Sequence, residues 1–300
     1  MPSTSPLPAA PGPDDFRALA RSSPWRFGTL HLTHRPSGGT AGEEEPVEAW
    51  LRRPGHLEVL AGGERHVETG VPYTRSALYL EEPRAGLRRR LSERLRGRSA
   101  RLRGRSARLR GRSARLRGWS AVPGLAPREV SVDPAVVPPQ SVEPVRRSDG
   151  LVLERPSGVD YDDPMWQNYR WVAMLDPVEL SHGVDLGEVH ARERLGRPTW
   201  TATCRPLPAS SEDFGDGYDP RCSCCALLFG AVSQALEFPA GDPLAPVPEE
   251  VAGYPSAYWV SLDVETGIVV DVEPQDGERT RTSFSNVIHE VGPLPAATDR

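Results

Sequence analysis

The chain has 300 residues, of which 36 are basic and 41 acidic, and all 36 basic residues are arginine. The lack of lysine excludes Schiff-base and pyridoxal-phosphate chemistry, and it leaves any P-loop or protein-kinase site without its phosphate-binding lysine. Asparagine and isoleucine, whose codons are AT-rich like those of lysine, occur only twice each, so we interpret the composition as that of a GC-rich genome.

The N-terminal residues MPSTSPLPAAPGPDDF have neither the basic nor the apolar region of a signal peptide. The longest apolar stretch, residues 222–236, is 15 residues long, which is shorter than the ~20 residues needed to span a bilayer. We therefore expect a cytoplasmic protein without a transmembrane segment.

Composition divides the chain into five parts. We predict one β-rich domain in two halves, residues 14–83 and 158–292, separated by an insert at residues 84–157. Residues 1–13 are predicted to be a disordered tail, and residues 293–300 a second tail.

The first half of the domain predicts an antiparallel meander. Asp14 or Asp15 can cap a short helix that runs to Arg21. Runs of alternating apolar and polar residues then predict strands at 27–34, 46–53, 56–61 and 64–69. Turn signals rich in glycine and proline separate these runs, as in consecutive hairpins.

The insert begins with a tandem repeat. The sequence RLRGRSA occurs three times, at 94–100, 101–107 and 108–114. A glycine in every heptad disfavours a helix, so we interpret the repeat as a solvated insert. Residues 84–118 hold 15 arginines and one acid, whereas the remainder of the chain holds 21 arginines and 40 acids. Such a block can contact polyanions nonspecifically.

The second half predicts helices and strands. Asp163 before Pro164 and Asp219 before Pro220 are typical helix starts. Alternation predicts a strand pair at 185–195 and 199–205, and three further strands at 257–264, 268–274 and 278–291. The Asp276-Gly277 dipeptide indicates a hairpin turn. Together these elements predict an α+β fold built on a curved antiparallel sheet.

Three segments resemble the half-barrel family of LolA and RseB, which are lipoprotein carriers and sigma-factor regulators. They are LARSSPWRFGTLHLTHRP with VEAWLRRPGHLEVL, then LGRPTWTATCRP, and finally YWVSLDVETGIVVDVEPQDG. The resemblance implies an open half-barrel whose concave face is packed with a few helices. It also implies binding of an acyl chain or a protein segment in that cavity, with no catalysis and no cofactor.

Four cysteines form the sharpest local feature. Cys222, Cys224 and Cys225 lie close to the predicted start of a helix, where thiol pKa values fall, and Cys204 lies inward on a strand. Three interpretations stay open: small apolar residues of the core, a redox pair, or a zinc site with Cys204, Cys222 and Cys225 as ligands.

Aromatic residues give the second set of candidates. Trp50, Trp200 and Trp259 fall on predicted strands. A predicted helix carries Trp166, Tyr169 and Trp171. They predict either ordinary core packing or an aromatic-lined cavity between sheet and helices.

No catalytic motif is present in the sequence, so we expect a protein that is not an enzyme. The first functional hypothesis is a binding protein for a hydrophobic small molecule or a protein segment. The alternative is an intracellular regulator that uses the cysteine cluster for redox or zinc chemistry.

Overall fold

The computed structural model describes residues 6–37, 45–70, 78–79, 128–129, 142–156, 163–208, 217–218, 220, 225–238, 242, 244–245, 248–277 and 283–294. By its contacts the chain divides into two compact units, one of residues 1–72 with 136–300 and one of residues 73–135. In the smaller unit the structure describes one short antiparallel pair, Leu78–Tyr79 (β5) with Arg128–Glu129 (β6).

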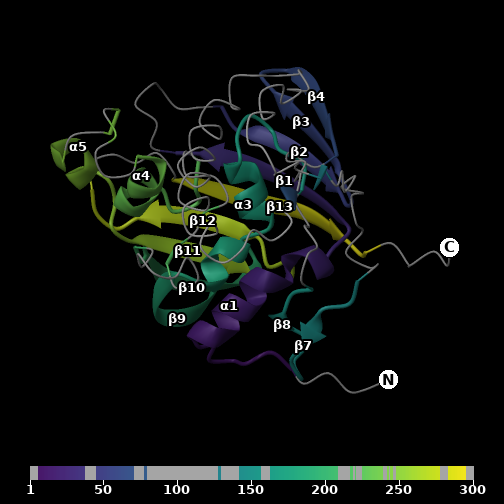
Figure 1. The fold of residues 1–300 in the computed structure, drawn as a ribbon. Helices are drawn as coiled ribbons and strands as arrows, with labels where there is room; N and C mark the ends of the chain where they lie inside the picture. The colour runs from purple at the N-terminus through teal and green to yellow at the C-terminus, as the bar shows by residue number, and fades with distance from the viewer. Residues whose placement is uncertain are drawn as a thin grey trace. The chain divides into compact units, whose positions relative to one another are not determined.

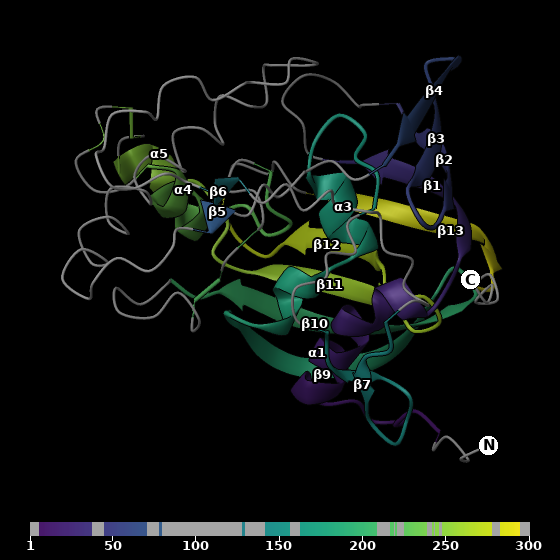
Figure 2. The same ribbon diagram turned by 45° about the vertical axis from the view of Figure 1, so that its right-hand side comes forward.

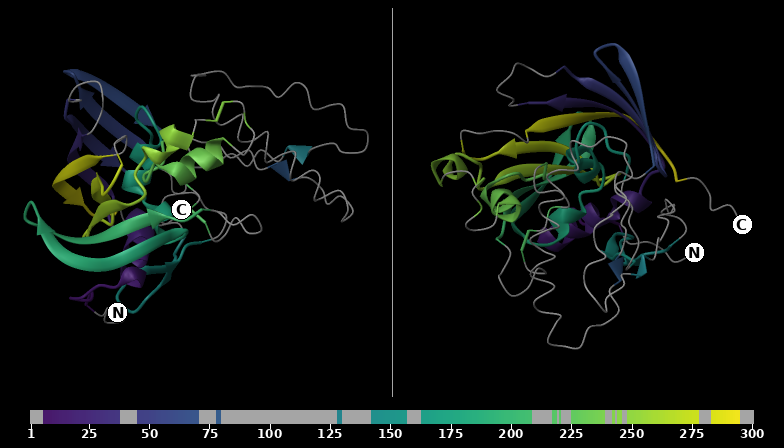
Figure 3. Two further views of the ribbon diagram at one scale, coloured as in Figure 1. Left: turned by 90° about the vertical axis from the view of Figure 1, so that its left-hand side faces the viewer. Right: turned by 45° about the horizontal axis from the view of Figure 1, so that its top comes forward.

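The larger unit is built on one open nine-stranded antiparallel sheet in the order β4-β3-β2-β1-β13-β12-β11-β10-β9 (Figure 1). Its strands are β1 (Thr29–Pro36), β2 (Val47–Arg52), β3 (His56–Ala61), β4 (Glu64–Thr69), β9 (Val184–Arg194), β10 (Arg197–Pro206), β11 (Tyr258–Asp263), β12 (Val269–Pro274) and β13 (Phe284–Gly292). A separate two-stranded pair joins β7 (Val145–Arg146) to β8 (Val152–Glu154). The sheet is curved, most visibly in the long β9–β10 hairpin (Figure 3).

In the part of the chain that the structure describes, helices are few and short. They are α1 (Pro13–Ser22), α3 (Arg170–Leu175), α4 (Ala231–Glu237) and α5 (Pro248–Ala252), with the 3-10 turns η1 (Ser23–Trp25) and η3 (Val178–Ser181). Figure 2 shows α1 and α3 on the same side of the strands, and both helices contribute buried residues to the main core. The structure is therefore α+β and dominated by antiparallel sheet, as predicted.

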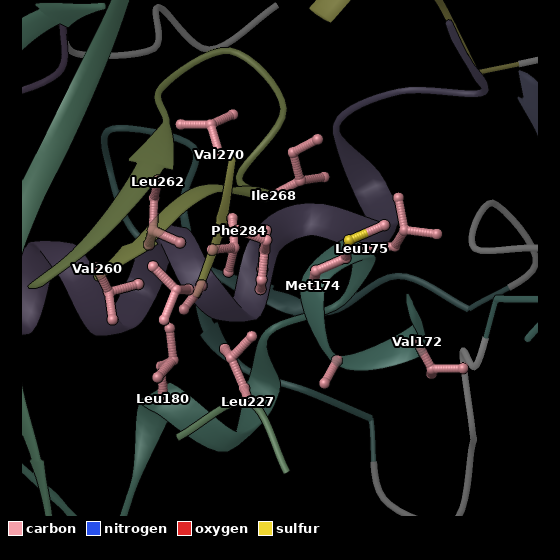
Figure 4. Packing of buried hydrophobic residues seen from close by; sticks show 14 of the residues in the cluster. Val172, Met174, Leu175, Leu180, Leu227, Val260, Leu262, Ile268, Val270 and Phe284 are labelled. Atoms are coloured by element: carbon pink, nitrogen blue, oxygen red, sulfur yellow. The ribbon is translucent and has the colours of Figure 1, made fainter. Parts of the chain in front are cut away.

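Alternation along the strands gives the sheet two distinct faces. We call the inner face the one that carries Leu30, Leu32, Ala49 and Val59, which are at most 2% exposed. Side chains of α3 pack on this face, and Figure 4 shows Met174 in the same cluster as Ile268, just before β12, and Phe284 of β13. The outer face carries the residues between them on each strand, such as Trp50 on β2.

An ion pair joins the segment LGRPTWTATCRP to the segment YWVSLDVETGIVVDVEPQDG. Arg197, at the start of β10, donates hydrogen bonds to both carboxylate oxygens of Asp263, at 2.7 and 3.0 Å. Asp263 also accepts bonds from the backbone N–H and the hydroxyl of Thr266, in the turn after β11. One buried carboxylate thus joins the two hairpins.

The strands lie close to their predicted positions. Residues 56–61 and 64–69 match β3 and β4 at both ends, and the other main strands begin and end within a few residues of prediction, except that β13 begins at Phe284 rather than residue 278. Alternation survives in the strands that have one face in the core. The edge strand β4 has no buried residue.

The predicted helix start at Asp163 is wrong, because α3 begins only at Arg170. The Asp163 carboxylate does not cap a helix. It is buried and bonded by the guanidinium of Arg53 at 2.7 and 2.9 Å. Gln167 has a φ of 61°, which interrupts helical geometry.

The helix predicted after Asp219 also begins later, at Ala231, with Gly230 as its N-cap. Before it, the backbone of residues 227–229 bonds to side chains rather than to a helical turn. The N–H of Leu227 donates to Glu179, and the carbonyl oxygen of Phe229 accepts the hydroxyl of Tyr258. These tertiary partners replace the hydrogen bonds that a helix would supply.

Candidate functional site

A cavity of about 300 Å³ lies between the inner face of the sheet and the segment that leads into α3. The sheet side comes from β1, β2 and β3 and the opposite side from residues 166–174. The described lining residues are His34, Pro36, Glu45, Val47, Ala61, Gly62, Trp166, Gln167, Asn168, Arg170, Trp171 and Met174. Its volume is at the lower end of the range for small-molecule sites.

Two indoles form an aromatic wall of this cavity. Trp166 and Trp171 meet edge to face, with ring centroids 5.3 Å apart and planes at 87°. The ring of Trp171 also lies 4.9 Å from that of His34 on β1. This arrangement offers a ligand a large apolar surface with few rotatable bonds.

His34 is the buried polar group of the wall, with 7% of its surface exposed. Its Nδ1 is 2.8 Å from Oδ1 of Asn286 on the neighbouring strand β13. Burial lowers the pKa of His34 to about 4, and the positive charge of Arg170 contributes in the same direction, while the bond to Asn286 acts against it. The imidazole is therefore neutral at physiological pH.

The aromatic segment is held in place by buried ion pairs at its two ends. Arg53 bonds Asp163 with two hydrogen bonds, and it also donates to the carbonyl oxygens of Ser23 and Leu175. After α3, Arg155 bonds both oxygens of the Asp176 carboxylate. These contacts fix Trp166 and Trp171 between two anchored points.

The charged groups at the cavity nearly balance. Arg170 and Glu45 both line it, one cationic and one anionic. An apolar site with few polar groups of mixed character orients a ligand rather than attracting one over a distance.

The six aromatic residues predicted from the sequence do not all meet here. Trp166 and Trp171 line the cavity, and Tyr169 is buried in the adjoining core. Trp200 also lies on the inner face, in the core beside Leu262. Trp50 and Trp259 project from the outer face, so the sheet separates them from the cavity.

Trp50 belongs to a second, shallower depression of about 510 Å³ on the outer face. Its indole stacks on the ring of His31 at 4.7 Å, and His31 in turn bonds Glu48 at 2.8 Å. The remaining lining residues are Thr29, Leu30, Leu51, Arg52, His56, Glu58, Arg65 and Glu290. The stack and the mixed charges are typical of a solvated strand face.

Neither of the two cysteines that the structure describes lies at the start of a helix, because the helix predicted there begins only at Ala231. Cys204 is fully buried on the inner face, and burial raises its thiol pKa. Cys225 precedes α4 by several residues, and its sulfur accepts the N–H of Tyr169 at 3.3 Å. No disulfide joins Cys204 to Cys225, while Cys222 and Cys224 lie outside the described residues.

Three further predictions concern the arginine repeat, a metal site and a transmembrane segment. The arginine repeat of residues 84–118 lies outside the described residues. Among those described, no group of three or more His, Cys, Asp or Glu side chains is arranged to hold a metal ion. None of the described helices is long and apolar enough to cross a membrane.

Sequence reasoning misses one residue of the aromatic wall, His34, which is one of several scattered histidines in the sequence. Alternation does carry a signal, because Leu30, Leu32 and His34 share one face of the strand at 29–36. A histidine on the apolar face of a strand is expected to be buried, and a buried imidazole needs a hydrogen-bond partner.

Comparison with known proteins adds no assignment: no family model matches the chain, and no curated protein matches it.

Proposed function

We propose that this chain is a non-enzymatic binding protein that holds a hydrophobic ligand or a protein segment in the cavity between sheet and helix. The observation that carries the proposal is the pair of indoles, Trp166 and Trp171, which form one wall of an open cavity of about 300 Å³. The described lining combines the aromatic wall with polar and charged side chains, which can orient a ligand.

The curved sheet agrees with an open half-barrel of the LolA and RseB kind, and in this proposal α1 and α3 fill its concave side. Support comes from their position on the same side of the strands and from the Arg197–Asp263 contact between two of the resembling segments. The proposed ligand site would then lie at the β1–β3 end of that concavity.

The thiol-based alternative has less support. Cys204 has a raised pKa because it is fully buried, whereas a reactive cysteine needs an exposed and electropositive setting. The contact of Cys225 with Tyr169 is an ordinary structural hydrogen bond.

The proposal is tested by filling the cavity. Ala61 lines it from β3, and the neighbouring Leu60 projects from the opposite face of the same strand. Ala61→Phe should weaken binding of an apolar probe such as 1-octanol at least tenfold, because the added ring occupies the site, whereas Leu60→Phe should leave binding unchanged. Isothermal titration calorimetry gives both affinities.

Native mass spectrometry of the freshly purified protein supplies an independent readout. Wild-type protein and Leu60→Phe should carry a co-purified apolar ligand that Ala61→Phe lacks. If wild-type protein bound no apolar probe and carried no ligand, the proposed function would be wrong.

A further inference from the structure

The chemistry of His34 narrows the class of ligand, provided that the proposed function holds. The ring is nine-tenths buried and lines the cavity. Its Nδ1 is bonded to Asn286, while its Nε2 has no hydrogen-bond partner among the described residues. A polar atom of a cavity-lining side chain that has no partner in the protein is a position where a ligand can complete the hydrogen bonding.

The tautomer of His34 follows from the orientation of Asn286. The amide nitrogen of Asn286 donates to the carbonyl oxygen of Val269 at 2.7 Å, so the oxygen of the same amide must face His34. That oxygen can only accept, which requires Nδ1 of His34 to carry the proton. In a neutral imidazole the other nitrogen, Nε2, is then an acceptor.

The Asn286 amide and the His34 ring cannot easily exchange their donor and acceptor atoms. Rotating the amide of Asn286 would set its oxygen against the carbonyl oxygen of Val269, and its nitrogen would also lose the contact with the Met174 sulfur at 3.6 Å. Protonation of His34 is opposed by its burial and by Arg170. The cavity wall therefore presents a fixed hydrogen-bond acceptor.

We propose that the cavity selects an apolar ligand whose polar end donates a hydrogen bond to Nε2 of His34, namely an alcohol or an amide in preference to a carboxylate. A carboxylate would set its lone pairs against that of Nε2 and would leave both groups unsatisfied. Arg170 lines the same cavity and its positive charge reaches His34, so comparing a carboxylate with neutral donors tests directly whether the lone pair of Nε2 or the guanidinium sets the order of affinities.

The test compares three probes with the same chain: 1-octanol, octanamide and octanoate, by calorimetry at neutral pH. Wild-type protein should bind the alcohol and the amide roughly tenfold more tightly than octanoate. His34→Phe should remove this preference, because a phenyl ring keeps the packing but has no acceptor. His31→Phe, three residues earlier on the outer face, is the matched control and should retain it.

A second variant keeps the test decisive if His34→Phe does not fold. Asn286→Asp places a carboxylate beside Nδ1, which favours the protonated imidazole, so Nε2 becomes a donor. The variant also loses the bond to the carbonyl oxygen of Val269, which lowers stability without changing this effect on His34. The order of affinities should then shift toward octanoate. Circular dichroism verifies that each variant is folded.

The outcomes separate the two proposals. Wild-type protein that binds none of the probes overturns the proposed function itself. Wild-type protein that binds all three equally, or octanoate most tightly, with the same order in His34→Phe, overturns the donor preference and leaves the binding function standing.

Discussion

Guanidinium groups serve as the internal anchors of this chain, which has no lysine. Arg53 satisfies one carboxylate and two backbone carbonyl oxygens at once, and its side chain is 2% exposed. The planar fork with five donors allows this, whereas a lysine ammonium would act as a single compact charge. Removing either partner of the Arg53–Asp163 pair would leave a buried charge and cost about 3–5 kcal/mol.

His34 should make the stability of the protein depend on pH. Its pKa is about 4 in the folded protein, against 6.5 as its ordinary value. Above pH 6.5 the ring is neutral in both states and the protein has its full stability. As the pH falls from 6.5 toward 4, the unfolded chain takes up a proton that the folded protein excludes, which lowers the free energy of unfolding by roughly 3 kcal/mol.

Urea unfolding of wild-type protein and His34→Phe across this range measures the effect. Because the carboxylates titrate equally in both proteins, the difference between the two curves isolates the histidine. That difference should change between pH 6.5 and 4, and His31→Phe should follow the wild type. Parallel curves for wild type and His34→Phe would show that His34 does not titrate in this way.

At the scale of elements, the strands could be predicted and the helix starts could not. A strand with one face in the core repeats every two residues, and this pattern is visible in the sequence. A helix start depends on what else its capping residue can bind. Asp163 precedes a proline, as an N-cap residue often does, yet its carboxylate pairs with Arg53, 110 residues earlier in the chain.

The candidate site shows the same limit. Trp166 could be predicted as a candidate because a large aromatic residue signals an apolar surface. The His34–Asn286 pair could not, because its members are 252 residues apart. Only the register of β1 against β13 brings them opposite each other, and register between distant strands leaves no mark in a single sequence.

The packing of α1 against the β11–β12 turn should depend on Gly267. This residue has a φ of +75°, and a Cβ there would lie 2.8 Å from the carbonyl oxygen of Leu19 in α1. Gly267→Ala should therefore destabilise the protein by about 2–4 kcal/mol, from backbone strain and from the displaced helix.

Gly196→Ala is the matched control for this prediction. Gly196 has nearly the same φ, +76°, and no atom lies within 4 Å of the position that a Cβ would take, so its cost of about 1 kcal/mol is that of the backbone alone. Thermal unfolding of both variants measures the difference. Equal costs would mean that α1 does not pack closely on the turn.

At the scale of the whole molecule, the sheet is formed by the two ends of the chain. Strands between residues 29 and 69 join those between 184 and 292 through the β1–β13 pair. The arginine block at residues 84–118 contributes none of the nine strands. Its flanks are close to each other, because Tyr79 of β5 is paired with Arg128 of β6.

Excising residues 84–118 should therefore leave the sheet intact. The deletion shortens the connection between Tyr79 and Arg128 from 48 residues to 13, which changes the entropy of closing that loop by only about 1 kcal/mol. It also removes 15 arginines and one acid, so the remaining protein is strongly acidic. We expect an unchanged or slightly higher thermal midpoint and the loss of binding to polyanions.

Fluorescence anisotropy with a labelled RNA at several salt concentrations measures this binding. The full chain should bind with an affinity that falls steeply as salt rises, because binding arginines to phosphates releases counterions. A variant with the same residues 84–118 in scrambled order is the control, and it should bind like the full chain, because the attraction depends on charge rather than on the heptad. Unchanged RNA binding after the deletion would show that the arginine block is not the contact, and loss of binding on scrambling would show that the repeat order itself is recognised.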